Sequence, residues 1–567
     1  MRIKQICTLL LAGAALCTFA GCQSGDTPNT VTTEAVTTAA PETEAPPFAI
    51  KLAELSDYVL VRPEETDDTL IDAATGLLKA INDTCSSSMA IKTDFYKEGM
   101  KGYEIVDREI LIGATNRPQT AAFLAGLKAD DYGYGIVDGK LVIAGHTSEA
   151  TAQAVSLFRL NVLGAGAATR TDFFTEGEGK IKTGIYDVES MTLCGRPIGE
   201  YTIVYAAGNK AFEKHLAELL ADHIAEMSGD VMQVVASSKA EGVKAKICVG
   251  DTGASAVSAL AGQYLLGADT SSEPTVVAAG ADSVGNAEAV LALIEQLTPA
   301  DGAKTVECTL AAPALTKIDD KTMSAMSFNV YVGNVVPERQ ARVLYQIETH
   351  LPDTFGVQEA SDTWMTYLKR ELDGYYACVG IGRDNGSGEH SAVFYAKDKF
   401  NLIDSGTKWL SDTPDVTSKF PSSSLNRIFS YAILERKSDG ARFMHVNTHF
   451  DHKSEEARGQ QAGVLLDFIA QYPDLPIICT GDFNTGYMGT IYKSLVAGRL
   501  GDAAELAPDA ERAATFHNYG KSATIIDFCF VTDDKIKAAY YDVCDDPVMG
   551  DYASDHHPVY IEYQLIG

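Results

Sequence analysis

The sequence predicts an α/β protein in which a duplicated α/β region precedes a C-terminal α/β domain. The first observation is that one order of elements (strand, helix, strand, strand, helix) occurs twice between residues 57 and 299. The second is that strands and amphipathic helices alternate again from about residue 323, with polar residues where strands end. A chain of 567 residues is also longer than one hydrophobic core usually serves, so we expect several domains.

The first copy of the repeat begins with a β-branched strand, a polar turn and an amphipathic helix, "DYVLVRPEETDDTLIDAATGLLKAI", and continues with "EILIGATN", "YGIVDGKLVIAG" and "TSEATAQAVSLFRLNVLG". The second copy reads "EYTIVYAAGNKAFEKHLAELLADHIAEMSG", "AKICVGDTG", "EPTVVAAG" and "SVGNAEAVLALIEQL". Patterns such as "EILIGAT" and "DGKLVIAG" resemble the non-catalytic α/β domain that precedes the catalytic barrel in β-hexosaminidases and α-glucuronidases. Because neither copy carries a convergent catalytic set, we interpret the region as a packing or spacing module. Binding of a glycan or a cell-surface partner is the alternative.

The N-terminus has the pattern of a bacterial secretory leader. Arg2 and Lys4 precede an apolar run that is too short for a comfortable transmembrane helix. The following "FAGC" resembles a lipobox, so Cys22 is the predicted lipidation site; the alternative is an ordinary secreted protein from which Cys22 is cut away. The next stretch is rich in Thr, Pro, Glu and Ala and predicts a disordered tether. The predicted order is leader, linker, first α/β copy, second α/β copy and C-terminal domain, at residues 1–22, 23–48, 49–185, 186–316 and 317–567.

The charge and the cysteines exclude some classes of protein. A formal net charge of -31 repels polyanions at long range, so a nucleic acid or phospholipid substrate would need a local basic pocket or a metal ion. This disfavours a non-specific nucleic-acid binder. The cysteines beyond Cys22 are scattered, several within apolar runs, and form no CxxC pair. They predict buried free thiols rather than a disulfide framework or a zinc site.

The C-terminal part alternates strands and helices. Its predicted strands include "MSAMSFNVYV", "TFGVQE", "RFMHVNTHF", "LPIICTGDFN", "TIIDFCFVT" and "HHPVYIEYQL", and Pro337 opens a helix after the first of them. The segment "SEEARGQQAGVLLDFIAQY" predicts a helix capped by Ser454, with apolar positions at helical spacing: Val464, Leu465, Phe468 and Ile469. Polar residues repeatedly follow the strands, which is how an α/β scaffold builds an active site.

Six motifs carry these polar residues. They are "SFNV" with Asn329, "VQE" with Glu359, "NTHFDH" with His449, "GDFN" with Asp482 and Asn484, "IDF" with Asp527, and "SDHHP" with Asp555 and His556. In this order, over roughly 245 residues, they resemble the endonuclease/exonuclease/phosphatase superfamily. The stretches "GRDNGSGEHSAVFYAKDKF" and "WLSDTPD" resemble its secreted bacterial branch, related to the carbon catabolite repressor type deadenylases. The resemblance implies a two-sheet α/β sandwich.

The resemblance also implies a metal-assisted phosphoester hydrolysis. A Mg²⁺ ion, with Mn²⁺ as the alternative, would neutralise the phosphate oxygens and stabilise the leaving oxyanion. Glu359 is then the expected main metal ligand, with Asn329 and Asp555 assisting. A histidine held in one tautomer by a carboxylate suits activation of water, so His556 is the expected base and Asp527 its orienting partner.

The remaining motif residues are expected to act on the substrate. Asp482 and Asn484 would position the nucleophile and a phosphoryl oxygen, while His449 would donate to the phosphate in the transition state. The adjacent histidines His557 and His452 compete for these assignments. By motif position we expect them to support the site or to face solvent.

Two further residues are candidates for substrate binding. Arg427 either clamps phosphate through its guanidinium or pairs with a surface acid, and Trp409 either lines a substrate wall or packs in the core. The bacterial branch usually carries a Trp-Asp-Ala element before this arginine. This chain has "KFPSSSLNR" instead, so its loop before Arg427 differs from that of the branch.

The predicted function is a surface-anchored, Mg²⁺-dependent phosphoric ester hydrolase on the extracellular side of a bacterial membrane, or a secreted one. Its substrate could be a nucleic acid, a phospholipid or a phosphorylated head group, and the sequence does not rank these firmly. The membrane would be a partner through the lipid anchor, and a glycan or cell-surface molecule a partner of the duplicated region. The alternatives are a nuclease acting on RNA or DNA and a non-catalytic surface binding protein.

Overall fold

The computed structural model describes residues 48–96, 105–164, 170–207, 212–253, 261–300, 302–548 and 551–566. The predicted leader, Cys22 and the linker up to residue 47 lie outside these ranges. The described chain divides into two compact units, one formed by residues up to Ser190 with Ile224–Val231, the other by Met191–His223 and the chain from Met232 onward. No helix among the described residues is long and apolar enough to cross a membrane.

The first unit is built on a six-stranded mixed sheet. The strand order is β3 (Ala90–Thr93), β2 (Val59–Arg62), β4 (Glu109–Ile112), β6 (Lys140–Gly145), β5 (Tyr132–Val137) and β8 (Lys180–Lys182). Strands β3, β2, β4 and β6 are parallel, whereas β5 runs antiparallel to β6 and to β8. A two-stranded sheet of β1 (Ala49–Lys51) and β7 (Asp172–Thr175) accompanies it.

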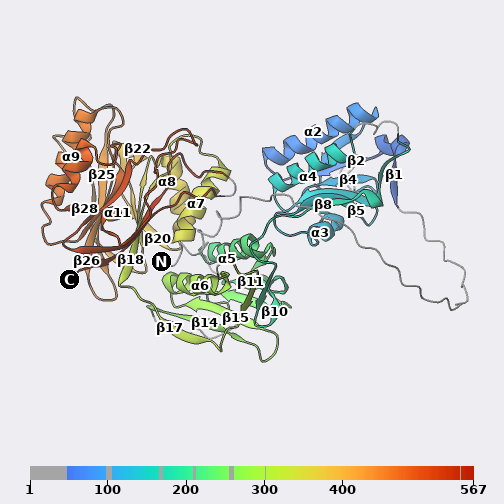
Figure 1. Ribbon diagram of the computed structural model, residues 1–567, viewed down its shortest axis with the longest axis horizontal. Helices are drawn as coiled ribbons and strands as arrows, with labels where there is room; N and C mark the ends of the chain where they lie inside the picture. The colour runs from blue at the N-terminus through green and yellow to red at the C-terminus, as the bar shows by residue number, and fades with distance from the viewer. Residues whose placement is uncertain are drawn as a thin grey trace, which may run out of the picture. The chain divides into compact units, whose positions relative to one another are not determined.

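Helices cover both faces of this sheet. Helices α2 (Asp68–Cys85) and α4 (Ser148–Asn161) lie on one face and α3 (Pro118–Leu124) on the other (Figure 1). Alternation along β4 explains the two layers: Ile110 and Ile112 belong to the core beneath α2 and α4, whereas Leu111 packs on the side of α3. Both faces of the parallel strands are therefore apolar.

The second α/β sheet repeats the first. Its strand order is β12 (Gln233–Ala236), β11 (Thr202–Tyr205), β13 (Lys246–Val249), β15 (Thr275–Gly280), β14 (Gln263–Asp269) and β17 (Ala314–Lys317). Each strand has the same rank and direction as its counterpart in the first sheet. Helices α5 (Phe212–Ser228) and α6 (Ser283–Leu297) correspond to α2 and α4, and a small sheet joins β10 (Arg196–Pro197), β9 (Ser190–Leu193) and β16 (Thr305–Cys308). The predicted duplication is present as a shared topology, while the domain boundaries stay predictions.

The C-terminal part contains two larger sheets. The first has the order β20 (Tyr376–Val379), β23 (Val393–Ala396), β19 (Thr354–Gln358), β18 (Thr322–Asn329), β32 (Val559–Leu565), β31 (Ile536–Val543) and β29 (Asp509–Ala510). The second has the order β24 (Phe400–Trp409), β25 (Ile428–Arg436), β26 (Arg442–His449), β27 (Ile477–Asp482), β30 (Asp527–Thr532) and β28 (Leu500–Asp502). A separate hairpin joins β21 (Gly382–Asp384) and β22 (Ser387–His390).

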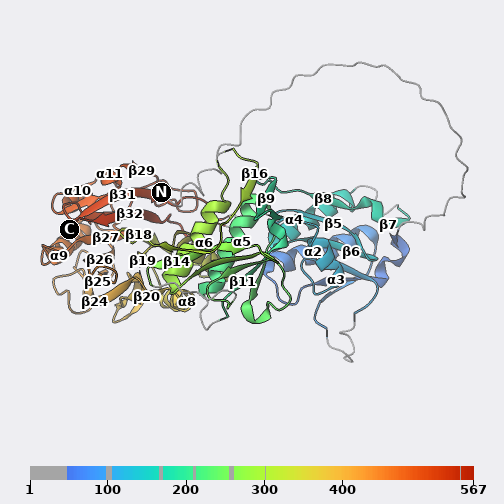
Figure 2. The ribbon, with the colours of Figure 1, turned by 90° about the horizontal axis from the view of Figure 1, so that it is seen from below.

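These two sheets form the predicted sandwich, with β18 and β19 beside β26 and β27 (Figure 2). The helices of this part are α7 (Pro337–His350), α8 (Asp362–Leu372), α9 (Glu455–Ile469), α10 (Thr490–Val496) and α11 (Ala503–Leu506). The Ser454 hydroxyl accepts the Ala457 N–H, which confirms the predicted cap of α9. Leu465 and Phe468, two of the apolar positions predicted for this helix, pack in the core of the second sheet.

A polar layer lies between the two sheets. The side-chain amide of Gln358 donates to Asn447 Oδ1 at 2.7 Å, and the ring nitrogens of His445 lie 2.8 and 2.9 Å from the hydroxyls of Thr354 and Thr480. All five side chains are buried. Alternation explains the layer, because the neighbouring residues of β26 face the apolar core under α9. Networks of this kind favour one register of the facing sheets.

Candidate active site

The predicted site residues gather at one edge of the sandwich. Strands β18, β19, β26 and β27 end at this edge, and the antiparallel strands β30 and β32 begin there. Strand pairing sets His449 opposite Asp482 and Asp482 opposite Asp527, in one row across the second sheet. The first sheet contributes Asn329 and, just after β19, Glu359.

Asn329 links the two sheets at this edge. Its amide donates to Glu359 Oε1 at 3.3 Å and to Asp482 Oδ2 at 3.0 Å. The other oxygen of Glu359 accepts the Val332 N–H at 3.0 Å. Glu359 has a φ of 57°, in the left-handed region that is uncommon for non-glycine residues and that clusters at functional sites. Carboxylates from both sheets are thereby held within contact of one amide.

Asp482 and Asn484 form a tight turn after β27. The Asn484 N–H donates to Asp482 Oδ1 at 2.9 Å, and Asn484 has a φ of 49°. The Asn484 side-chain nitrogen lies 3.0 Å from His449 Nε2 and donates to the Phe450 carbonyl at 3.1 Å. His449 Nε2 is 3.5 Å from Asp482 Oδ2. Burial, followed by the charges of two nearby arginines, holds the pKa of His449 well below its usual value.

His556 and Asp527 form the predicted pair. His556 Nδ1 lies 2.8 Å from Asp527 Oδ2, so the Nε2 atom is directed to the other side, 3.9 Å from Asp482 Oδ2. Burial alone would lower the pKa of His556, but the charges of Asp527, Asp482 and Asp555 raise it to about 10. Burial, and then the charge of Asp527, raise the pKa of Asp482 well above its ordinary value.

The neighbouring histidines lie apart from this row. The ring of His557 stacks on that of His517 with centroids 4.0 Å apart, and burial lowers the pKa of His557 to about 3. His452 is exposed, and its Nδ1 lies 3.2 Å from Arg427 Nη2. These positions agree with the order expected from the motifs, although the catalytic roles themselves stay predictions.

The residues fit a divalent metal ion. Among the described residues, two groups could offer ligand atoms to one ion: Glu359, His449 and Asp482, and Asp482, Asp527 and His556. Four carboxylates converge here, and burial raises the pKa of both Asp482 and Asp555. A hard cation would favour their ionised forms and replace the contacts that the Asn329 amide makes with Glu359 and Asp482. The side chains at this edge therefore have the chemistry of a metal-binding site.

The structure also places the two substrate-binding candidates. Arg427 is buried immediately before β25, near Asp482 and Glu359. Trp409 is buried at the end of β24, and its indole N–H donates to the Arg383 carbonyl at 2.8 Å. The substrate-binding role of Trp409 stays a prediction. This hydrogen bond also identifies a residue that the sequence analysis did not single out, Arg383, which ion-pairs with Glu389 at 2.6 Å. Both lie in the stretch "GRDNGSGEH", whose resemblance was the available signal.

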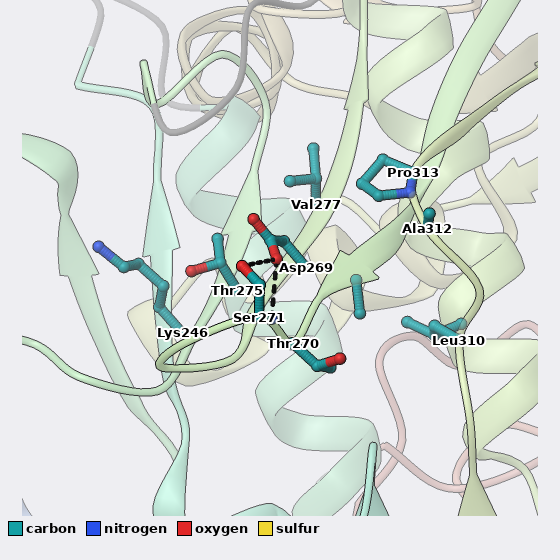
Figure 3. Close-up of a pocket in the computed structure, with 10 residues that line it drawn as sticks. Lys246, Asp269, Thr270, Ser271, Thr275, Val277, Leu310, Ala312 and Pro313 are labelled. Carbon is teal, nitrogen blue, oxygen red and sulfur yellow. Dashed lines mark hydrogen bonds between the residues drawn. The ribbon is translucent and has the colours of Figure 1, made fainter.

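A separate pocket lies in the second α/β region (Figure 3). Ten residues line it, among them Lys246, Asp269 and Pro313. The Asp269 carboxylate accepts the Ser271 N–H and hydroxyl hydrogen at its mouth. No lining residue is aromatic, so the pocket offers no ring on which a sugar could stack. Glycan binding by the duplicated region stays a prediction.

Comparison with known proteins identifies a family for the C-terminal part of the chain. Residues 326–556 match the model of the Endonuclease/Exonuclease/phosphatase family. An endonuclease/exonuclease/phosphatase family protein from Bacteroides thetaiotaomicron is 31% identical, with 43% of this chain and 98% of that chain covered and a TM-score of 0.41. A mannosyl-6-phosphatase from the same organism is 30% identical, with 42% and 99% covered and a TM-score of 0.40. The D. rerio TDP2, solved with a single-strand DNA product, is 18% identical, with 43% and 100% covered and a TM-score of 0.37.

The chain therefore belongs, through residues 326–556, to the endonuclease/exonuclease/phosphatase family, whose members are hydrolases of phosphoesters. No curated protein matches the chain. The family model does not extend into residues 49–316, so the resemblance of that region to the accessory domain of β-hexosaminidases stays a prediction.

Proposed function

We propose that this protein is a surface-anchored, divalent-metal-dependent phosphoesterase. The observation that carries the proposal is the row of His449, Asp482 and Asp527 across the second sheet. His556 forms a hydrogen bond with Asp527 and so joins this row. Glu359 and Asn329 approach the same row from the other sheet. Acid, amide and imidazole groups thus converge on one point, which a structural turn or helix cap would not require.

The metal ion proposed for this site is Mg²⁺, with Mn²⁺ as the alternative. Glu359 would hold it, with Asn329 and Asp555 assisting, because all three are oxygen donors. His449 also lies within reach, which suits Mn²⁺ better than Mg²⁺. When bound, the ion would neutralise the phosphate oxygens and stabilise the leaving oxyanion.

The proton of the attacking water has two candidate acceptors. The sequence analysis assigns it to His556. The imidazole of His556, however, lies among the carboxylates of Asp527, Asp482 and Asp555, and this surrounding favours its protonated form. An imidazolium cannot accept a proton, but it can donate from Nε2 to a phosphoryl oxygen. The proposal therefore gives the proton to Asp482 and the phosphoryl oxygen to His556.

The substrate class is the open part of the proposal. The 30% identical mannosyl-6-phosphatase acts on a sugar phosphate, which favours a phosphorylated sugar or head group. The formal charge of -31 opposes binding of a long nucleic acid through many basic contacts. A nuclease is therefore the second candidate, and a phospholipid remains a candidate because of the proposed anchor. A non-catalytic binding protein is the least supported, since every motif position is filled.

The proposed location is the extracellular side of a bacterial membrane, with Cys22 carrying the lipid and residues 23–48 as tether. The duplicated α/β region would then hold the catalytic domain away from the surface. Replacement of Cys22 by Ala should release the protein from the membrane fraction without loss of specific activity. Equal retention of both forms on the membrane would contradict lipid anchoring.

A substrate panel tests the proposed activity. The purified protein is assayed with an aryl phosphate, a bis-aryl phosphodiester, RNA, DNA, sphingomyelin, inositol phosphates and mannose 6-phosphate, with Mg²⁺, with Mn²⁺ and with EDTA. We expect metal-dependent hydrolysis of at least one substrate, and loss of it in Asp482→Asn. The exposed Asp509→Asn variant, outside the site, serves as the matched control. Absence of hydrolysis throughout the panel would overturn the proposal.

A further inference from the structure

Two buried arginines flank the catalytic row. Arg427 is 3% exposed and Arg383 is 9% exposed. Both guanidinium charges act on His449, and Arg427 is also near Asp482 and Glu359. The two arginines come from different elements, the segment before β25 and the strand β21, so their proximity is a property of the fold rather than of the local sequence.

Neither arginine is fully satisfied within the protein. Arg427 Nη2 contacts His452, but its buried Nε has no hydrogen-bond partner and no carboxylate of the described residues lies within 4.0 Å of its guanidinium. Arg383 Nη1 donates to Glu389, whereas its buried Nε makes no hydrogen bond. A buried guanidinium with unpaired N–H groups is costly, and a second one nearby adds repulsion.

The nearby carboxylates also compensate the positive charges of Arg383 and Arg427 only in part. Burial, and then the charge of Arg383, lower the pKa of Arg427, while Glu389, Asp482 and Glu359 oppose this. Burial raises the pKa of Glu389, the closer of the two carboxylates that pair with Arg383. The other, Asp384, is more exposed, and its Oδ2 lies 3.7 Å from Arg383 Nε, beyond hydrogen-bond distance. An anion placed between the two guanidiniums would remove both the repulsion and the unpaired donors.

The hairpin that carries Arg383 is held firmly. The Arg383 carbonyl accepts the Trp409 indole N–H. The Asn426 amide donates to Asp384 Oδ1 at 2.8 Å, which ties the hairpin to the segment that carries Arg427. The Ile381 N–H donates to the Thr407 hydroxyl at 3.1 Å. The two cations are therefore positioned before any ligand arrives, as a binding site for an anion requires.

We propose that Arg383 and Arg427 form an oxyanion-binding wall of the active site that selects the dianionic terminal phosphate of a phosphomonoester. This inference rests on the proposed phosphoesterase activity and specifies its substrate class. A monoester carries up to two charges and three non-bridging oxygens, whereas a diester carries one charge and two such oxygens. His449, Asn484 and His556 are already proposed to contact the phosphate, so two further guanidiniums favour the substrate that has a second negative charge and a third non-bridging oxygen.

A pair of substrates with the same leaving group tests the selection. We compare kcat/KM for p-nitrophenyl phosphate with kcat/KM for bis(p-nitrophenyl) phosphate in the natural protein, Arg383→Met and Arg427→Met. Loss of a charge-assisted contact should lower the monoester-to-diester ratio by about 10- to 100-fold. Arg383→Lys and Arg427→Lys keep the charge but lose the planar guanidinium. Their monoester-to-diester ratios should lie between those of the natural protein and of the Met variants. They keep the test decisive if the Met variants fail to fold.

The matched control is Arg442→Met. Arg442 is an exposed arginine at the opposite end of β26 from His449 and pairs with Glu435, so its loss changes the net charge equally. We expect its ratio to stay within about 2-fold of that of the natural protein. Ratios that remain unchanged in all four arginine-wall variants, with activity present, would overturn the wall while leaving the phosphoesterase proposal intact.

Binding of inorganic phosphate gives a readout that needs no turnover. In EDTA, millimolar phosphate should raise the melting temperature of the natural protein and of Arg442→Met by more than that of Arg383→Met or Arg427→Met, because each of these two variants loses one of the fixed guanidiniums that hold phosphate without the metal. Equal shifts in all four proteins would count against the wall. Failure of the natural protein to hydrolyse any substrate of the panel would instead count against the proposed function, and the phosphate shifts would still decide whether the wall exists.

Discussion

The imidazole of His556 is fixed by Asp527, whose Oδ2 lies 2.8 Å from Nδ1. This contact leaves the other ring nitrogen, Nε2, available for a further partner, and Nε2 lies 3.9 Å from Asp482 Oδ2. Asp527 is itself held in place, because its N–H donates to the Thr515 hydroxyl at 3.0 Å. The pair therefore behaves as a positioned donor whose orientation depends on one carboxylate.

The first prediction concerns this pair. His556→Ala should lower kcat/KM by about 100- to 10,000-fold, and Asp527→Asn by a smaller factor, because the latter disturbs only the orientation and charge of the imidazole. His557→Ala serves as the matched control, since that ring stacks on His517 outside the row. Circular dichroism confirms folding. A severe defect in His557→Ala beside a mild one in His556→Ala would reverse the assignment.

The second prediction concerns the metal ion. EDTA should abolish activity and added Mg²⁺ or Mn²⁺ should restore it, because the site concentrates carboxylates that repel a phosphate. Glu359→Gln should raise the metal concentration needed for half-maximal activity by about 10- to 100-fold, and titration calorimetry should report the same weakening of metal binding. Full turnover in excess chelator would remove the metal from the mechanism.

The third prediction concerns acid stability. Burial lowers the pKa of His445, in the polar layer, to about 3. A histidine whose folded pKa is depressed contributes stability that is present above its unfolded pKa of about 6.5 and is lost as the pH falls toward the folded value. Between about pH 7.5 and 4.5 this single group should reduce the free energy of unfolding by about 3 kcal/mol.

The comparison of the natural protein with His445→Gln isolates this effect. The variant should be less stable at neutral pH, since the contacts with Thr354 and Thr480 change, but its stability should fall less steeply with acid. Tryptophan fluorescence reports the relevant domain, because both tryptophans, Trp364 and Trp409, belong to the C-terminal part. Identical slopes against pH in the two proteins would contradict a neutral buried imidazole.

Short motifs made the row of site residues predictable from the sequence. Asn329, His449, Asp482 and Asp527 are terminal residues of their strands, and the other motif residues lie close to a strand end in the sequence. A correct strand assignment therefore already fixes the edge at which Asp482 and Asp527 lie. The α9 cap at Ser454 was predictable for the same reason, because it depends on residues close in sequence.

Arg383 was not predictable in this way. It lies in a hairpin whose turn contains Asn385 and Gly386 with positive φ, a segment without apolar periodicity. The position of this hairpin depends on hydrogen bonds with residues distant in sequence, Trp409 and Asn426. The side of β24 on which Trp409 lies was equally hard to predict from the sequence. A bulge in β24 between Leu402 and Asp404 shifts the alternation, so counting along the strand from its start assigns the wrong side.

The fourth prediction concerns modularity. A fragment beginning near Lys317 should fold and retain kcat/KM on small substrates, because all six motifs follow that residue and a domain of about 250 residues can bury its own core. Its melting temperature should be lower than that of the full chain, because it loses two contacts. The ring centroids of Phe212 and Tyr375 are 4.7 Å apart, and His215 Nδ1 lies 2.6 Å from Glu348 Oε1. An insoluble or inactive fragment would mean that the second α/β region completes the core or the site.

The fifth prediction separates a small-substrate enzyme from a nuclease by its response to salt. A protein that holds a long polyanion through many basic contacts loses affinity by roughly a decade per phosphate contact for each decade of salt. In this chain phosphate would instead meet the metal, His449, Asn484 and the buried Arg427, which are few and poorly screened. We expect the slope of log kcat/KM against log salt to correspond to about one or two contacts between about 50 and 300 mM NaCl, with little preference for long substrates. A steep slope, together with strong preference for polynucleotides over an aryl diester, would make the nuclease the better candidate.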